Sequence, residues 1–236
     1  MMVKSISFPA AILFFGLLHS LSCQAGSLKS MLMTEDTTIS ADLSQFSNRK
    51  IIPKIIEESA LKALSFYPEL MDTHIRFVFK QHISKSVMQA QPVFSTLLLP
   101  KSQRKYQINI SALFRLNHAA IPIHQIPENI MIGWIGHELG HIMDYEQRTS
   151  WGLVRYGWGY VFSEKYLRKA EAMADTYAVN HGLAEYIVAT KRFILNHAEL
   201  PQVYKDRISR LYLSPDDIVK QVREMEQQKN NKSKPQ

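Results

Sequence analysis

The spacing of hydrophobic residues along this chain divides it into two parts. In the first part, a stretch beginning at Arg49 has apolar residues at helical spacing, and Pro53 suits the first turn of such a helix. Three shorter segments then have the alternation or the composition of strands: 74–80, 93–99 and 104–111. From Pro127 to about residue 225 the spacing is helical almost throughout. The pattern predicts an α+β fold, in which one helix and a small sheet precede a helical half.

The N-terminal segment has the layout of a secretory signal. Lys4 precedes an apolar run from Ala10 to Leu18, and small residues follow that run. The run is shorter than the roughly 20 residues that span a bilayer. We therefore expect an exported protein, located in the periplasm of a Gram-negative bacterium. Its predicted parts are a signal peptide (1–25), a polar lead-in (26–48), one folded domain (49–225) and a disordered polar tail (226–236).

Cys23 is the only cysteine of the chain, so the fold cannot depend on an internal disulfide. We favour ordinary signal cleavage, after Ser22 or after Ala25, because small residues surround both points. The alternative is a lipid anchor at Cys23, which would hold the protein on a membrane. Lipoprotein signals prefer leucine three positions before the cysteine, where this chain has Ser20.

The formal charge of +7 is spread over the chain and does not gather in one basic run. A nucleic-acid interface would need clustered Lys and Arg with aromatic residues between them, so no nucleic-acid partner is expected. The surplus of positive charge suits solubility or attraction to an anionic lipid surface. A peripheral contact with a membrane therefore stays open as an interpretation.

Candidate chemistry lies in residues 131–146, MIGWIGHELGHIMDYE, within a helix predicted from about 127 to 147. His137 and His141 are four positions apart, so their imidazoles lie on one helical face and can bind one Zn²⁺ ion. Glu138 lies about 100° further round the helix, where it can activate an attacking water instead of binding the metal. A surface helix with two chance histidines is the alternative, but two unpartnered imidazoles would be costly in such apolar surroundings.

A catalytic zinc site needs a third protein ligand. Residues 168–182, RKAEAMADTYAVNHG, supply two carboxylates at helical spacing, Glu171 and Asp175, on a helix whose small residues permit close packing. Glu171 can bind the metal, while Asp175 can accept the second ring N–H of a ligand histidine. Without the His-Glu-His helix, the same pair would equally suit an exposed helix whose charges are balanced by nearby basic residues.

These two motifs resemble the gluzincin zinc metallopeptidases, in particular the family of the CAAX prenyl protease, the HtpX-type heat-shock membrane protease and their soluble periplasmic relatives. Members combine HExxH with a distal Glu-x-x-Ala-Asp, which residues 171–175, EAMAD, match. The resemblance implies a zincin-like α+β domain with one zinc ion per chain. It places the ligands at His137, His141 and Glu171, and the catalytic base at Glu138.

The chain departs from this family in two respects. Relatives often carry a His-Pro segment that leads into Arg-Ile, and this chain has 207–208 as Arg-Ile but Pro201 about where the histidine would stand. No segment corresponds to the integral membrane helices of the family. The match covers about residues 125–212 of the predicted zinc metallopeptidase domain, 49–225.

The resemblance implies an exported zinc endopeptidase that hydrolyses polypeptides, with a role in protein quality control of the cell envelope. The sequence leaves the donor to the oxyanion open: Arg207 is the first candidate, from the family match, followed by Tyr204 and then by His181 and His197. Residues 106–111, YQINIS, are the candidate edge strand for pairing with a substrate backbone.

Two further features have more than one interpretation. Residues 150–162, SWGLVRYGWGYVF, suit a lid, a substrate-lining segment, a membrane contact or plain packing between the two ligand helices. The Asp144 side chain suits either an ion pair or a position from which it contacts a ligand of the metal. The alternative function is a catalytically weak zinc-fold module that binds or chaperones envelope proteins, although such a module would have no need for Glu138.

Overall fold

The computed structural model describes residues 43–232 of the chain, except residues 82, 84 and 85. The predicted signal peptide and Cys23 lie outside the described residues, as do residues 233–236. The fold is α+β and mostly helical, with a small mixed sheet, as the hydrophobic pattern predicts. Within the described part of the chain, none of the helices combines the length and the apolar character that crossing a membrane requires.

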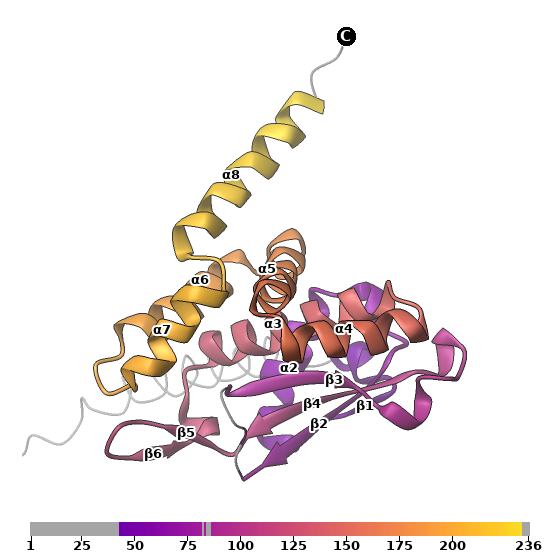
Figure 1. The fold of residues 1–236 in the computed structure, drawn as a ribbon, viewed down its shortest axis with the longest axis horizontal. Helices are drawn as coiled ribbons and strands as arrows, with labels where there is room; N and C mark the ends of the chain where they lie inside the picture. Colours follow the sequence, from indigo (N-terminus) through magenta and orange to yellow (C-terminus); the bar gives the residue numbers. More distant parts are fainter. Residues whose placement is uncertain (1–42, 82, 84–85, 233–236) are drawn as a thin grey trace, which may run out of the picture. The chain divides into compact units, whose positions relative to one another are not determined.

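Four strands form the main sheet, in the order β1-β2-β4-β3 (Figure 1). β1, β2 and β4 run parallel to one another, and β3 pairs antiparallel with β4 at one edge. Their bounds are Lys50–Ile51 (β1), His74–Lys80 (β2), Met88–Pro92 (β3) and Lys105–Ser111 (β4). A separate hairpin, which was not predicted from the sequence, pairs β5 (Leu113–Arg115) with β6 (Ala120–Pro122).

The alternating strand predicted at 74–80 is confirmed, whereas the strand predicted at 93–99 is wrong. β3 ends just before that segment, and the short 3₁₀ helix η4 (Phe94–Thr96) lies within it. The apolar residues that suggested a strand include some of the most exposed of the chain, since Phe94 is 82% and Leu98 93% accessible. Most of the hydrophobic residues of this segment therefore lie at the surface, and Leu97 alone of its leucines is buried.

Helices make up most of the remaining structure. Their bounds are α2 (Glu57–Ser65), α3 (Glu128–Glu146), α4 (Ser150–Phe162), α5 (Glu164–Asn180), α6 (Ala184–Asn196), α7 (Gln202–Leu211) and α8 (Pro215–Lys232). The other 3₁₀ helices are η1 (Gln45–Ser47), η2 (Lys54–Ile56), η3 (Pro68–Leu70), η5 (Lys101–Gln103) and η6 (Ile123–Gln125). The helix predicted from about 127 to 147 is α3, and all its residues from 130 to 145 are buried. α3 is therefore the central helix of the core.

Two helix boundaries differ from the predicted ones. Lys50–Ile51 pairs with β2, so the first helix begins only after Pro53, as η2 followed by α2. At the other end, α8 makes residues 226–232 helical, so the prediction of a disordered tail is wrong for those residues. α8 is held to the domain by Ile218, whose side chain is fully buried.

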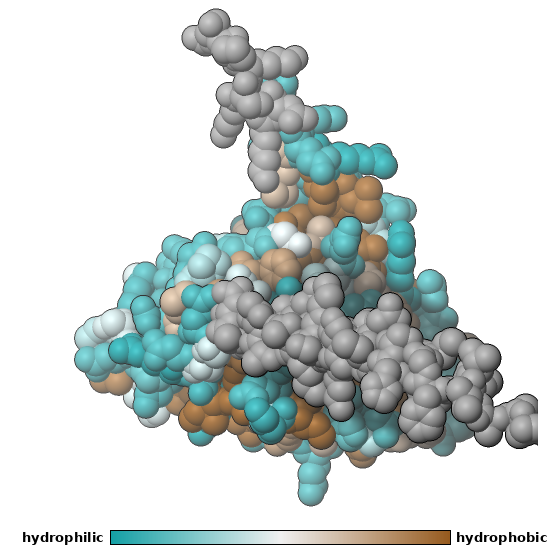
Figure 2. Space-filling model, turned by 180° about the vertical axis from the view of Figure 1, so that it is seen from behind, coloured by the Kyte–Doolittle hydropathy of each residue, from teal (hydrophilic) through white to brown (hydrophobic). Residues whose placement is uncertain are grey.

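One hydrophobic core joins the sheet to the helices. Phe77 of β2, Ile108 of β4 and Ile135 of α3 are all buried in it, and Figure 1 shows α3 passing over the sheet. Seen from behind, hydrophilic residues dominate the surface, and hydrophobic side chains gather at the base of α8 (Figure 2). α3 packs against α2, β3, α5 and α6, so its side chains can meet residues from each of these elements.

Candidate metal centre

Helices α3 and α5 bring together the residues that the two sequence motifs identified. α3 carries His137 and His141, and α5 carries the two predicted carboxylates. The helices approach closely at Gly140, where a Cβ atom would lie 2.4 Å from the carbonyl oxygen of Ala174. Only glycine fits at this point, and the close approach lets α5 reach both histidines.

His137, His141 and Glu171 form a buried group that could hold a metal ion. One carboxylate oxygen of Glu171 lies 3.0 Å from Nε2 of His137 and 3.3 Å from Nε2 of His141. Ligand atoms bound at about 2.0–2.1 Å to a tetrahedral ion are about 3.3 Å apart, which these two distances match. The ligand atoms of all three side chains lie within 4.8 Å of one another, so the group could hold one ion. The exposed fractions are 9% for His137, 4% for His141 and 1% for Glu171, so little water competes for the position.

The electrostatics of this group favour a cation at its centre. Burial alone would lower the pKa of His137, but hydrogen bonds with Asp175 and Glu171 outweigh burial and raise this pKa to about 10. Burial alone would raise the pKa of Glu171, but His141 and His137 outweigh it and hold that pKa well below its usual range. A positive charge between these side chains, carried by a proton or by a metal ion, is therefore stabilised.

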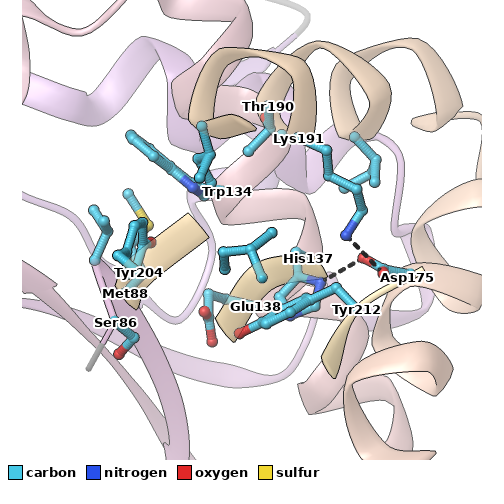
Figure 3. Close-up of a pocket in the computed structure, with 15 residues that line it drawn as sticks. Ser86, Met88, Trp134, His137, Glu138, Asp175, Thr190, Lys191, Tyr204 and Tyr212 are labelled. Atoms are coloured by element: carbon cyan, nitrogen blue, oxygen red, sulfur yellow. Dashed lines mark hydrogen bonds and ion pairs between the residues drawn. The ribbon is translucent and has the colours of Figure 1, made fainter. Parts of the chain in front are cut away.

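Asp175 lies behind His137 and is fully buried. Its Oδ1 is 2.9 Å from Nδ1 of His137, and its Oδ2 is 2.8 Å from Nζ of Lys191 (Figure 3). The backbone N–H of Leu213 also donates to Oδ2, at 3.2 Å. Burial alone would raise the pKa of Asp175, but Lys191 and His137 outweigh it and lower the pKa. Asp175 therefore stays ionised and orients the His137 ring with Nε2 beside Glu171.

Two residues near the centre were not identified from the sequence. Lys191 of α6 is only 4% exposed, although Ile187 and Ile194, about one helical turn away, are buried apolar residues. A lysine that interrupts the apolar side of a helix was a visible signal, and it could have identified Lys191. Tyr160 of α4 donates its hydroxyl to Glu171 at 2.6 Å, and no sequence spacing connects these two residues.

Glu138 lies beside the histidines and contacts the edge strand β3. Its Oε2 accepts a hydrogen bond from the backbone N–H of Ala90 at 2.5 Å, and the hydroxyl of Tyr145 donates to the carbonyl oxygen of Ala90 at 3.2 Å. Burial raises the pKa of Glu138. A carboxylate with a raised pKa is a stronger proton acceptor, which is the property that a general base needs.

The backbone of Ala90 faces the free side of β3. Val87 and Val93 pair with β4 through backbone hydrogen bonds of 2.9 and 2.8 Å. Successive residues of an edge strand bond to opposite sides, so Ala90 directs its N–H and C=O away from β4. The strand predicted at 104–111 is confirmed as β4, but it lies between β2 and β3. The prediction that YQINIS is an edge strand is therefore wrong, because β3 covers that side of it.

A cavity of about 140 Å³ opens beside the metal-binding group. Its lining includes Glu138, Tyr160, Arg207 and Tyr212. Arg207, the first oxyanion candidate, therefore lines the candidate site, and its Nε atom is buried without a hydrogen-bond partner in the described part of the chain. Tyr204, the second candidate, lines a neighbouring cavity that also contacts Glu138 (Figure 3).

The remaining sequence candidates lie apart from this cavity. His181 and His197 contact aromatic rings elsewhere in the core, and neither contributes to the lining of the cavity. Asp144 forms an ion pair with Arg148 at 2.8 Å, in agreement with one of its two interpretations. Residues 150–162 form helix α4, whose Tyr160 connects it to the centre.

Scans of the chain against protein-family models, curated proteins and solved structures find no match. The buried group that could hold a metal ion, the carboxylate beside it and the free edge of β3 are therefore observations of this chain alone. A proposal about function has to depend on their geometry.

Proposed function

We propose that this protein is an exported zinc-dependent endopeptidase of the gluzincin type, similar to the soluble periplasmic relatives of the CAAX prenyl protease and HtpX-type family. The observation that carries the proposal is the position of Glu138, which lies both beside the metal-binding group and at the free edge of β3. Burial of a carboxylate costs free energy of folding, and Glu138 is not one of the proposed metal ligands that would offset this cost. A function in catalysis would explain why it is buried here. Two imidazoles and one carboxylate are a ligand set that suits catalytic zinc.

The chemistry follows from the side chains that line the cavity. A bound zinc ion would act as a Lewis acid that polarises the scissile carbonyl and lowers the pKa of the attacking water. Glu138, whose pKa burial raises, takes a proton from that water and then delivers it to the leaving nitrogen. Arg207 donates a hydrogen bond to the oxyanion. Asp175 accepts a hydrogen bond from Nδ1–H of His137, which leaves Nε2 of the ring available to the metal.

The substrate in this proposal is a polypeptide bound as an additional strand beside β3. The outward N–H and C=O of Ala90 bond to its backbone once Glu138 and Tyr145 release them. Strand addition selects unfolded segments, because a folded protein does not offer a free extended backbone. This selectivity suits protein quality control in the cell envelope.

The proposal is tested by the zinc content of the purified mature chain together with cleavage of an unfolded protein such as casein. We expect about one zinc ion per chain. Glu138→Gln should retain the metal and lose about 100- to 10,000-fold in turnover, because only the proton transfer is removed. His137→Ala and Glu171→Ala should lose metal and activity together.

Each variant can contradict a different part of the proposal. Full zinc occupancy in Glu171→Ala would remove Glu171 from the ligand set. Cleavage at the wild-type rate in Glu138→Gln would contradict the peptidase mechanism. Stoichiometric zinc without any cleavage by the wild-type protein would instead favour a zinc-fold module that binds envelope proteins.

A further inference from the structure

A groove of about 480 Å³ adjoins the proposed active site, between β3 and α4. It shares Gln89, Ala90, Tyr145 and Tyr160 with the cavity beside the metal-binding group, so the two spaces meet along these residues. Its remaining lining is largely apolar and includes Pro92, Phe94, Leu97, Leu153, Trp158 and Phe162. Ligand pockets in proteins commonly measure about 300–1,000 Å³, so the groove has room for a sizeable group.

Gly157 of α4 has no packing reason to be glycine. A Cβ atom at this position would meet no atom of the described residues within 4 Å, whereas a Cβ at Gly159 would lie 2.8 Å from the ring of Tyr166. Glycine in the middle of a helix lowers helix stability relative to alanine. Gly157 lines the groove. A larger residue at this position would project its side chain into the groove beside α4.

Large apolar side chains at the groove remain exposed to water. Phe94, Trp158 and Phe162 are 82%, 65% and 73% exposed, and the rings of Trp158 and Phe162 stack with their centroids 4.9 Å apart. A soluble protein rarely gathers such side chains on its surface unless they contact a ligand or a partner. The groove is therefore a candidate binding surface.

The strand that forms one wall of the groove indicates what fills it. Ala90 lines both the groove and the cavity, and its N–H and C=O point away from β4. A polypeptide uses both features at once, because its backbone pairs with a strand edge while its side chains enter the neighbouring hollow. A lipid acyl chain has no hydrogen-bonding groups and could use only the apolar surface.

We propose that the groove is the specificity pocket of this peptidase and that it receives a large aromatic or aliphatic side chain of the substrate. The inference rests on the proposed function and adds a substrate class, namely unfolded segments that expose bulky apolar residues. Segments with only small or charged side chains near the cleaved bond bind weakly, because they leave the groove filled with water.

The experiment measures binding of short fluorescein-labelled peptides to the Glu138→Gln protein by fluorescence anisotropy. One peptide carries a single Phe in a background of Ser and Thr, and its partner carries Ala at that position. We expect the Phe peptide to bind at least about tenfold more tightly, because the phenyl group becomes buried. Adding Gly157→Phe should remove this difference, and adding Gly157→Leu should reduce it. Gln227→Phe places the same phenyl group on the exposed part of α8 and serves as the matched control.

The outcomes separate this inference from the proposed function. Equal affinity for the two peptides, or a Phe preference that survives Gly157→Phe, would overturn the groove proposal. A Phe preference abolished by Gly157→Phe supports the proposal even where the wild-type protein cleaves nothing, a result that would contradict the peptidase alone. Equal peptide affinity together with binding to phosphatidylglycerol vesicles that Gly157→Phe weakens would assign the groove to a membrane surface and also overturn the proposal.

Discussion

Lys191 offsets the charge of Asp175 beside the proposed zinc centre. Asp175 is one of three buried carboxylates there, together with Glu138 and Glu171. Lys191 and Asp175 form a buried ion pair at 2.8 Å. Removal of one partner from such a pair leaves an uncompensated charge in a poorly solvated place. The lysine therefore acts on the metal through Asp175 and His137.

We expect Lys191→Met to lower the free energy of unfolding by about 3–5 kcal/mol, since it breaks a buried ion pair. Zinc affinity should fall by about 10–100-fold, because Lys191 keeps the buried Asp175 ionised and in position behind the His137 ring. Chemical denaturation and titration with a competing chelator measure the two effects. Lys191→Arg keeps the charge and should recover part of both.

Lys220 provides the matched control for this substitution. It forms an exposed ion pair with Glu224 at 3.9 Å, so Lys220→Met should leave unfolding and zinc affinity close to wild type. Wild-type zinc affinity in Lys191→Met would limit Lys191 to a structural role. Asp175→Asn should reproduce the loss of zinc affinity, because it weakens the same acceptor.

The sequence could identify His137, Glu138 and the EAMAD carboxylates because helical spacing fixes which side chains share a face. The same reasoning could not find Tyr160 or Ala90. These residues reach the centre from α4 and β3, through packing between elements that no local spacing encodes. The residues of the site were thus predictable where their relative positions depend on spacing along a single helix.

At the level of elements, the site depends on how closely α3 and α5 approach each other. We expect Gly140→Ala to destabilise the protein by about 1–3 kcal/mol, because its Cβ would lie 2.4 Å from a backbone oxygen of α5 and the helix must move. Zinc affinity should fall as well, since Glu171 moves with α5. Thermal denaturation and chelator competition measure both changes.

Gly136→Ala tests whether this effect comes from the helix contact or from any added methyl group on α3. Its Cβ would lie 2.7 Å from the end of the Leu183 side chain, which can rotate away. We therefore expect Gly136→Ala to retain zinc. Equal zinc loss in Gly136→Ala and Gly140→Ala would contradict a specific role of the α3–α5 contact.

The accuracy of the fold prediction differed between elements for a physical reason. α3 was predicted to within a residue or two because its long apolar stretch admits one periodicity. β3 was missed because its sequence, MQAQP, alternates in burial but contains neither β-branched nor aromatic residues. Residues 93–99 looked more like a strand, but Phe94 and Leu97 of this segment line the groove and Leu98 is exposed outside it.

For the whole molecule, the proposed metal site implies that metal and proton compete for the same centre. The proton on His137 stabilises the metal-free protein below pH 6.5, and this contribution is lost as the pH rises through about 10, the raised pKa of His137. Zinc must displace that proton, so its affinity should rise by up to about tenfold per pH unit between these values. We expect the increase in Tm on adding zinc to be larger at about pH 8.5 than at about pH 6.5.

Thermal scans at a fixed excess of free zinc, with EDTA-treated samples at each pH, measure this difference. Free zinc at about 100 times Kd should add about 2.7 kcal/mol to the free energy of unfolding. A zinc-induced increase in Tm that shrinks as the pH rises from 6.5 to 8.5 would contradict the competition.

The hydrogen bonds at Ala90 also bear on the solubility of the protein. An edge strand with uncovered backbone groups recruits strands from other molecules and starts aggregates. Glu138 and Tyr145 cover the outward N–H and C=O of Ala90, so β3 offers fewer free groups to a second copy. Glu138, which we assign to catalysis, therefore also limits self-association through β3. A Glu138→Ala protein would lose this protection of the strand edge together with the general base, so it would precipitate in storage for a reason unrelated to hydrolysis.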